Sequence, residues 1–129
     1  MKKLLILLIL SLVLLFNTQA QSFNIEWLDG TWKGTGYQVD DQRWSIELTC
    51  DHIKNAFTIS YPSLGCLGNW EPANVEACRM VFRERIDSGP CDSFTMVILT
   101  KIDEYHISIS YIVPGASKEI VAFSVLKRQ

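Results

Sequence analysis

Hydrophobic and polar residues alternate with a period of two along most of the chain after residue 30. In the segment 44–50, Trp, Ile, Leu and Cys share one face while Ser, Glu and Thr share the other. The same alternation recurs at 57–61, 78–86 and 105–111. A period of two is typical of β-strands that bury one face, so each segment is predicted to be a half-buried strand.

Turn-forming residues separate these segments, as at Asp40-Asp41 and Ser88-Gly89-Pro90, and no window carries a helical apolar stripe. The whole pattern predicts strands near 31–39, 44–50, 55–61, 67–71, 78–86, 93–101, 105–113 and 119–127. Seven or eight short antiparallel strands on hairpin-length connections indicate an all-β fold, either an up-and-down barrel or a sandwich. We favour the barrel, because closure removes the exposed edges of an open sheet.

Two of the predicted strands contain segments that are apolar on both faces, 94–99 and 120–126. Continuous apolar runs are expected where a strand is covered on both sides or contacts a partner. Both explanations stay open at the level of sequence.

The N-terminus has the layout of a secretory signal peptide. Lys2 and Lys3 precede an apolar run over residues 4–16, and a short polar stretch ends at Ala20. The run is shorter than the roughly 20 apolar residues that span a bilayer. We therefore expect cleavage after Ala20, with an uncleaved N-terminal anchor as the alternative.

Residues 21–129 are then one domain, because their number suffices for one core and not for two. Of the 12 Lys and Arg residues two lie in the leader, which leaves ten against 14 Asp and Glu. An acidic domain without a basic stripe argues against nucleic-acid binding. No second apolar segment is long enough to cross a membrane, so we expect a periplasmic or secreted protein.

All four cysteines lie in this domain: Cys50, Cys66, Cys78 and Cys91. An even number in a small exported domain indicates two disulfides, and the spacing lacks the close pair of a zinc site. If alternate strands run up and down, only the pairing Cys50–Cys78 with Cys66–Cys91 joins cysteines at the same end. This depends on the short strand at 67–71. Each bridge would close a loop of about 25 residues and contribute ~3 kcal/mol.

Gly30-Thr31-Trp32, at the start of the first predicted strand, resembles the Gly-x-Trp motif of calycins, the superfamily of lipocalins and fatty-acid-binding proteins. The resemblance implies a barrel in which Trp32 closes one end and an Arg on the last strand, here Arg128, packs across it. The alternative is that Trp32 is an ordinary core residue.

The central segment resembles a family of small exported bacterial domains with a Tyr-Pro-Ser-Leu-x-Cys-Gly-Gly box, whose relatives also occur beside some bacterial serine/threonine kinases. The similarity rests on residues 61–66, on Glu84-Arg85-Ile86, and on Gly89 followed by Cys91. It extends over about 30–127 and departs from the box where Leu67 precedes Gly68 and by a second cysteine pair. It implies a β-barrel-like fold and the Cys66–Cys91 bridge, and no chemistry.

Glu84 is a candidate ligand-binding residue because it lies on the apolar face of its strand, between Phe82 and Ile86. A buried carboxylate needs a partner or a raised pKa. It either orients a ligand inside the barrel or acts as a structural brace bonded to a Tyr or Arg.

Trp32, Trp44 and Tyr61 are the other candidate ligand-binding residues, and Tyr37 and Trp70 could extend the same aromatic wall. Core packing explains the same residues. Gly34 and Gly36 leave one face of their strand bare, which suits a tight barrel bend or the close approach of a ligand.

No catalytic motif is found. His52 and His106 have no neighbours at metal-ligand spacing, and there is no Gly-x-Ser-x-Gly elbow. A glycosidase-like carboxylate pair stays open, because sequence does not give the distance between carboxylates. We expect a protein that is not an enzyme and uses no metal or cofactor.

Two functions follow from these expectations. The first is a binding protein for a small apolar ligand held inside the barrel. The second is a protein-interaction module, such as an inhibitor of a secreted hydrolase or an envelope adaptor, with an extracytoplasmic protein as its partner. For the second, the predicted long connection 62–77 would offer Trp70 and Glu71 as interface residues.

Overall fold

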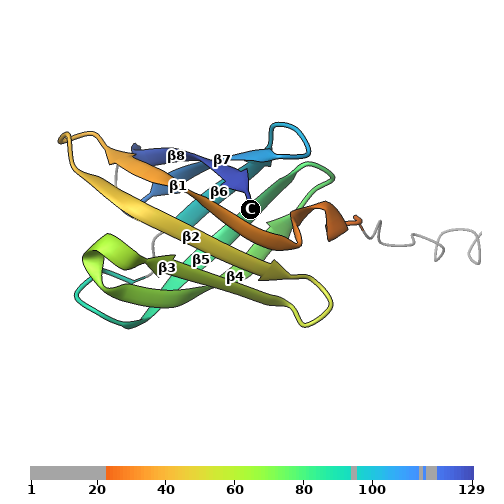
Figure 1. Cartoon of the computed structure of the whole chain (residues 1–129), viewed down its shortest axis with the longest axis horizontal. Coiled ribbons are helices and arrows are strands. Elements are labelled where there is room, and N and C mark those ends of the chain that lie inside the picture. Colours follow the sequence, from red (N-terminus) through yellow and green to blue (C-terminus); the bar gives the residue numbers. More distant parts are fainter. Residues whose placement is uncertain (1–22, 94–95, 114, 116–118) are drawn as a thin grey trace, which may run out of the picture.

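Eight antiparallel strands form a closed up-and-down barrel in which each strand pairs with the next and β8 pairs with β1 (Figure 1). The computed structural model describes residues 23–93, 96–113, 115 and 119–129. The predicted signal peptide, residues 1–20, lies outside the described residues. The strands are β1 (Gly30–Gln38), β2 (Arg43–Asp51), β3 (Ala56–Tyr61), β4 (Cys66–Val75), β5 (Arg79–Ser88), β6 (Met96–Lys101), β7 (His106–Ile112) and β8 (Ile120–Arg128). Two short 3-10 helices accompany them, η1 (Glu26–Leu28) and η2 (Pro62–Leu64).

The barrel core consists of the residues that share the inward phase of each strand. Along β2, for example, Ile46, Leu48 and Cys50 are buried, whereas the residues between them are more exposed. Burying one Leu, Ile or Phe side chain contributes roughly 1.5–3 kcal/mol. The prediction of an up-and-down barrel is confirmed. Each strand has an apolar face, and closing the sheet buries these faces against one another. No helix among the described residues is long and apolar enough to span a membrane.

The fourth strand is longer than its sequence predicts. A Pro normally ends a strand because it cannot donate a ladder hydrogen bond, yet β4 continues through Pro72 to Val75. β3 pairs with β4 only as far as Asn69, and the β4–β5 register shifts between Pro72 and Asn74. The bulge accommodates Pro72, so the predicted long connection over 62–77 is wrong.

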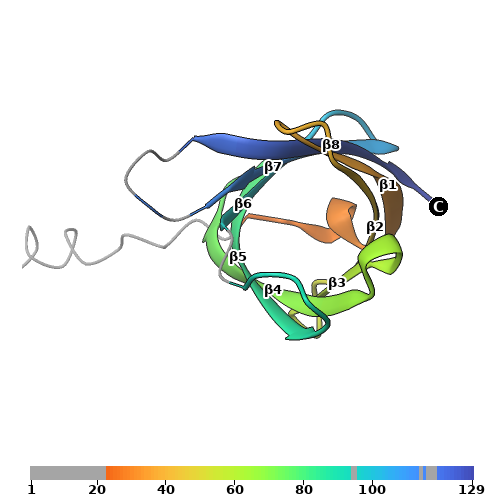
Figure 2. The ribbon, with the colours of Figure 1, turned by 90° about the vertical axis from the view of Figure 1, so that its left-hand side faces the viewer.

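One end of the barrel is sealed by η1, the preceding residues and the last strand, and we call it the closed end. Trp32 is fully buried there, and its indole N–H donates to the carbonyl of Leu28 at 2.8 Å. The Arg128 guanidinium lies 4.1 Å from the centre of the Trp32 ring and donates to the backbone carbonyls of Trp27, Asp29 and Glu104. The expected contact between Trp32 and Arg128 is therefore present. Figure 2 looks into the opposite, open end, and η1 is visible across the interior at the far side.

Only one of the two predicted disulfides is formed. Cys66 and Cys91 are bonded at the open end and tie the segment after η2 to the β5–β6 connection. Cys50 and Cys78 are free, so the predicted Cys50–Cys78 bridge is wrong.

The two free cysteines share an end of the barrel but differ in depth. Cys50 points into the core and Cys78 is exposed. The segment around η1 runs between their neighbourhoods, because Asp29 accepts from the backbone N–H of His52 while the indole of Trp27 donates to the carbonyl of Ala77. The strand order predicted correctly that Cys50 and Cys78 lie at the same end of the barrel, but it did not predict the segment around η1 between them.

The last strand presents an apolar outer face. Phe123 and Val125 are 55% and 53% exposed, and the Phe123 ring stacks on Tyr37 of β1 with ring centres 5.6 Å apart. Of the two alternatives for 120–126, coverage on both sides is contradicted by these exposed side chains, and contact with a partner stays a prediction. In the other such segment, residues 94–95 lie outside the described residues.

Candidate functional site

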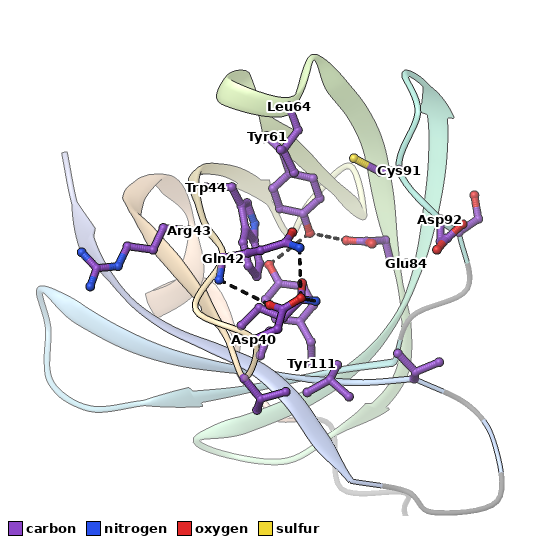
Figure 3. Close-up of a pocket in the computed structure, with 16 residues that line it drawn as sticks. Asp40, Gln42, Arg43, Trp44, Tyr61, Leu64, Glu84, Cys91, Asp92 and Tyr111 are labelled. Carbon is purple, nitrogen blue, oxygen red and sulfur yellow. Dashed lines mark hydrogen bonds between the residues drawn. The ribbon is translucent and has the colours of Figure 1, made fainter.

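The open end of the barrel contains a pocket of about 440 Å³ (Figure 3). Its wall is formed by inward side chains of β2, β3, β5, β7 and β8, and its rim by the β1–β2 turn, η2 and the β5–β6 connection. Ligand pockets are typically about 300–1,000 Å³. The interior is thus packed at the closed end and hollow at the open end.

Three aromatic side chains line the pocket: Trp44, Tyr61 and Tyr111. Their rings meet edge-on or tilted, with centres 6.1–6.4 Å apart. Such arrangements place the positive edge of one ring near the negative face of another. Gly36, which pairs with Trp44 across β1 and β2, provides the space for the indole, because a Cβ at Gly36 would overlap that ring.

Glu84 lies at the base of this aromatic group and is only 4% exposed. Tyr61 and Trp70 donate hydrogen bonds to the same carboxylate oxygen, Oε2, the latter at 2.9 Å. The second oxygen, Oε1, has no hydrogen-bond partner among the described side chains. Glu84 is one of the residues that line the pocket.

The Glu84 carboxylate has hydrogen bonds but no counter-ion. The ion pairs among the described residues involve Lys33, Lys54, Arg85, His52 and His106, and none of them reaches Glu84. Burial raises the pKa of Glu84, while the hydrogen bonds from Tyr61 and Trp70 lower it by less. The expected brace to a Tyr is present, and the bonds from Tyr61 and Trp70 use one carboxylate oxygen, Oε2.

The hydrogen-bonded cluster around Glu84 continues through Tyr61 to Tyr111 on the opposite wall of the barrel. The hydroxyls of Tyr61 and Tyr111 are 3.0 Å apart. A hydroxyl has one hydrogen, so when Tyr61 donates to the Glu84 carboxylate it accepts from Tyr111. Burial raises the pKa of both tyrosines, so both stay neutral donors.

The rim carries Asp40, Asp92 and Arg43. Asp40 is bonded within its turn by the side chains of Gln38 and Gln42. The Arg43 guanidinium lies over the outward-facing ring of Tyr37, at 5.4 Å from its centre, and points away from Glu84 (Figure 3). The pocket interior is therefore aromatic and negative.

Three of the four predicted ligand-binding residues come together here: Trp44, Tyr61 and Glu84. Trp32 does not, because it is sealed at the closed end. Tyr37 also falls outside the pocket, since it lies on the opposite face of β1 from Trp32 and stacks on Phe123. Tyr111 completes the wall, and its inward phase on β7 was the only sign of it in the sequence.

The two predicted interface residues, Trp70 and Glu71, point to opposite sides of β4. Trp70 is 2% exposed and lies beneath Glu84, so it has no surface to offer a partner, contrary to the prediction. Glu71 points outward, 3.4 Å from Arg85. A partner for Glu71 stays a prediction.

Models of protein families, curated proteins and solved structures give no match to the chain. The function is therefore inferred from the geometry of the pocket.

Proposed function

We propose that this domain is a non-enzymatic binding protein that holds a small, largely apolar molecule in the pocket at the open end. The observation that supports it best is a cavity of about 440 Å³ lined by three aromatic rings. A mostly apolar wall with a few placed polar groups is what small-molecule sites usually have. Trp44 and Tyr111 supply contact area, and Glu84 supplies orientation.

The proposal is tested with the neutral fluorescent probe N-phenyl-1-naphthylamine. Ala122 lines the pocket and pairs with Tyr111 across β7 and β8, so Ala122→Phe is expected to fill the cavity and abolish probe binding. Val125→Phe on the outer face of the same strand is the matched control and should bind like the unmodified protein. Circular dichroism confirms that both variants fold. Equal probe binding by Ala122→Phe and Val125→Phe would contradict the proposal.

A second candidate is a protein-interaction module, and the exposed outer face of β8 favours it. Phe123 and Val125 form an apolar surface that extends onto β1 through the stacked Tyr37. A stoichiometric partner from the native envelope should be lost in Phe123→Ser/Val125→Ser and kept in the pocket variant Ala122→Phe. A partner that binds both variants equally does not use this face.

We also propose an extracytoplasmic location. The Cys66–Cys91 disulfide is compatible with an oxidising compartment, and residues 1–20 have the layout of a signal peptide. Sequencing of the mature protein should find Gln21 at the N-terminus. A chain that still begins at Met1 and fractionates with the cytoplasm would overturn this.

A further inference from the structure

Glu84 is a buried carboxylate whose charge nothing among the described residues neutralises. Buried acidic side chains are normally paired with a cation, because removing an ion from water is costly. Here both protein donors, the hydroxyl of Tyr61 and the indole of Trp70, are neutral and bind Oε2. No cation and no further donor among the described residues reaches Oε1, and Glu84 lines the pocket.

The aromatic rings around Glu84 favour a bound cation, as the Glu84 carboxylate itself does. Trp44, Tyr61 and Tyr111 line the same pocket. The faces of Trp and Tyr rings attract cations, most strongly where water is excluded. Tyr61 and Tyr111 line this pocket together with Glu84, so a carboxylate and aromatic rings surround the same space.

The charged side chains at the rim of the pocket also favour a positively charged ligand. Asp40 and Asp92 lie at the entrance, and the nearby cation, Arg43, is held over Tyr37 on the outside. At the closed end, by contrast, the protein itself supplies cations to the aromatic rings: Lys101 lies over Trp27, and Arg128 lies over Trp32. Negative groups around a cleft raise the local concentration of cations and oppose anions.

We propose that the pocket binds a small protonated amine, whose ammonium group pairs with Oε1 of Glu84 and whose apolar part packs against Trp44 and Tyr111. This inference rests on the proposed binding function and names its ligand class. A pocket near the lower end of the usual range of about 300–1,000 Å³ suits an amine with one or two rings. An aliphatic or aromatic acid should bind more weakly, because its carboxylate would meet the Glu84 carboxylate without a cation between them.

The test compares three probes of matched size by titration calorimetry at pH 7, using the disulfide-bonded domain. These are 2-phenylethylamine, which is cationic, 2-phenylethanol, which is neutral, and phenylacetate, which is anionic. We expect the amine to bind about tenfold or more tighter than the alcohol, and the acid to bind weakest. The comparison requires no mutation, so it does not depend on a variant that folds.

Glu84→Gln then assigns the preference to one carboxylate. The Gln side chain keeps the oxygen that accepts from Tyr61 and Trp70 and removes the charge. The amine should lose its advantage while the alcohol binds as before. Glu71→Gln on the outer face of β4 is the matched control and should keep the full preference.

The outcomes separate the two proposals. If the alcohol binds as tightly as the amine and N-phenyl-1-naphthylamine binds, the amine inference fails and the binding function stands. If neither the three probes nor N-phenyl-1-naphthylamine bind, both proposals fail. Retention of the amine preference in Glu84→Gln would also overturn the inference.

Discussion

The two ends of the barrel each place one charged group among aromatic rings, and they treat it differently. At the closed end the Arg128 cation lies on Trp32 and donates to three backbone carbonyls. At the open end the Glu84 carboxylate lies beneath Trp44, Tyr61 and Tyr111 with two neutral donors on one oxygen. At the closed end, backbone carbonyls accept the hydrogen bonds that the Trp32 indole and the Arg128 guanidinium donate.

The difference indicates which end of the barrel would hold the proposed ligand. Hydrogen bonds and ring contacts complete the closed end, so Trp32 and Arg128 act as structure. The open end has space, an aromatic wall and a carboxyl group that pairs with no cation among the described residues, so we place the proposed ligand there, against Trp44 and Glu84. The following predictions test this division, from the largest expected effect to the smallest.

Truncating one Trp at each end should separate stability from binding. Trp32→Ala is expected to lower the free energy of unfolding by about 3–5 kcal/mol, because it opens a cavity around a fully buried side chain. Trp44→Ala, at a half-buried position, should cost about 1–2 kcal/mol and abolish binding of N-phenyl-1-naphthylamine. Urea unfolding and probe fluorescence measure the two effects. Equal losses of stability in the two variants would contradict the division.

Replacing the bonded cysteines should cost more stability than replacing a free one. Cys66→Ser/Cys91→Ser is expected to lower the free energy of unfolding by about 3 kcal/mol, because the bridge closes a loop of 25 residues. Cys78→Ser should change it by less than about 0.5 kcal/mol, because that side chain is exposed and free. Thiol counting on the unreduced, unfolded protein should find two free thiols. Finding none would restore the Cys50–Cys78 bridge.

The cysteines show what the sequence could and could not predict about the fold. Alternation with period two, continuous apolar runs and the turns between them predicted the eight strands, and counting the strands placed each cysteine at the correct end. Pairing Cys50 with Cys78 required knowing that one points into the core and that η1 lies across this end. The segment around η1 carries no periodic pattern, so its position depends on tertiary contacts such as the bond from Trp27 to Ala77.

Adding one methyl group at Gly36 should disturb the pocket indirectly. The Cβ of Gly36→Ala would overlap the Trp44 ring, so the indole must move. We expect a loss of about 1 kcal/mol in stability and weaker probe binding, since overpacking typically costs 1–3 kcal/mol and Trp44 is only half-buried. Gly115→Ala, with no atom of the described residues within 4 Å of the added Cβ, is the control and should leave both quantities unchanged. Tight probe binding by Gly36→Ala would show that Trp44 is not part of the site.

The pH dependence of stability should report the buried carboxylate of the empty protein. Burial raises the pKa of Glu84 above the ordinary 4.5, so the folded state holds a proton that the unfolded chain releases. The stabilisation is full below pH 4.5 and is lost as the pH rises through the raised pKa. Tyr61 and Tyr111, which face Glu84, titrate far above this window, and Asp40, Asp92 and Arg43 lie at the rim.

Between pH 4.5 and neutrality, the unmodified protein should therefore lose stability relative to Glu84→Gln. Urea unfolding of both proteins across this interval measures the difference. A difference that does not change with pH would mean that Glu84 is not buried as a lone carboxylate.

The candidate site was only partly predictable. Glu84 was found because a carboxylate in the apolar phase of a strand is unusual, and Trp44 and Tyr61 were found by type and phase. Tyr111 approaches Tyr61 only because the barrel closes, and sequence does not say which inward residues meet across the interior. Trp70 was assigned to the predicted long connection 62–77, whereas β4 runs through this segment with a bulge after Pro72 and keeps Trp70 in the barrel wall.

The most direct test of the account is the pKa of Glu84, followed through its side-chain carboxyl carbon by NMR. We predict that saturating 2-phenylethylamine lowers this pKa, because a bound ammonium stabilises the carboxylate, and that 2-phenylethanol does not. A Glu84 pKa that is the same with and without the bound amine would contradict the claim that the open end is built to receive a cation.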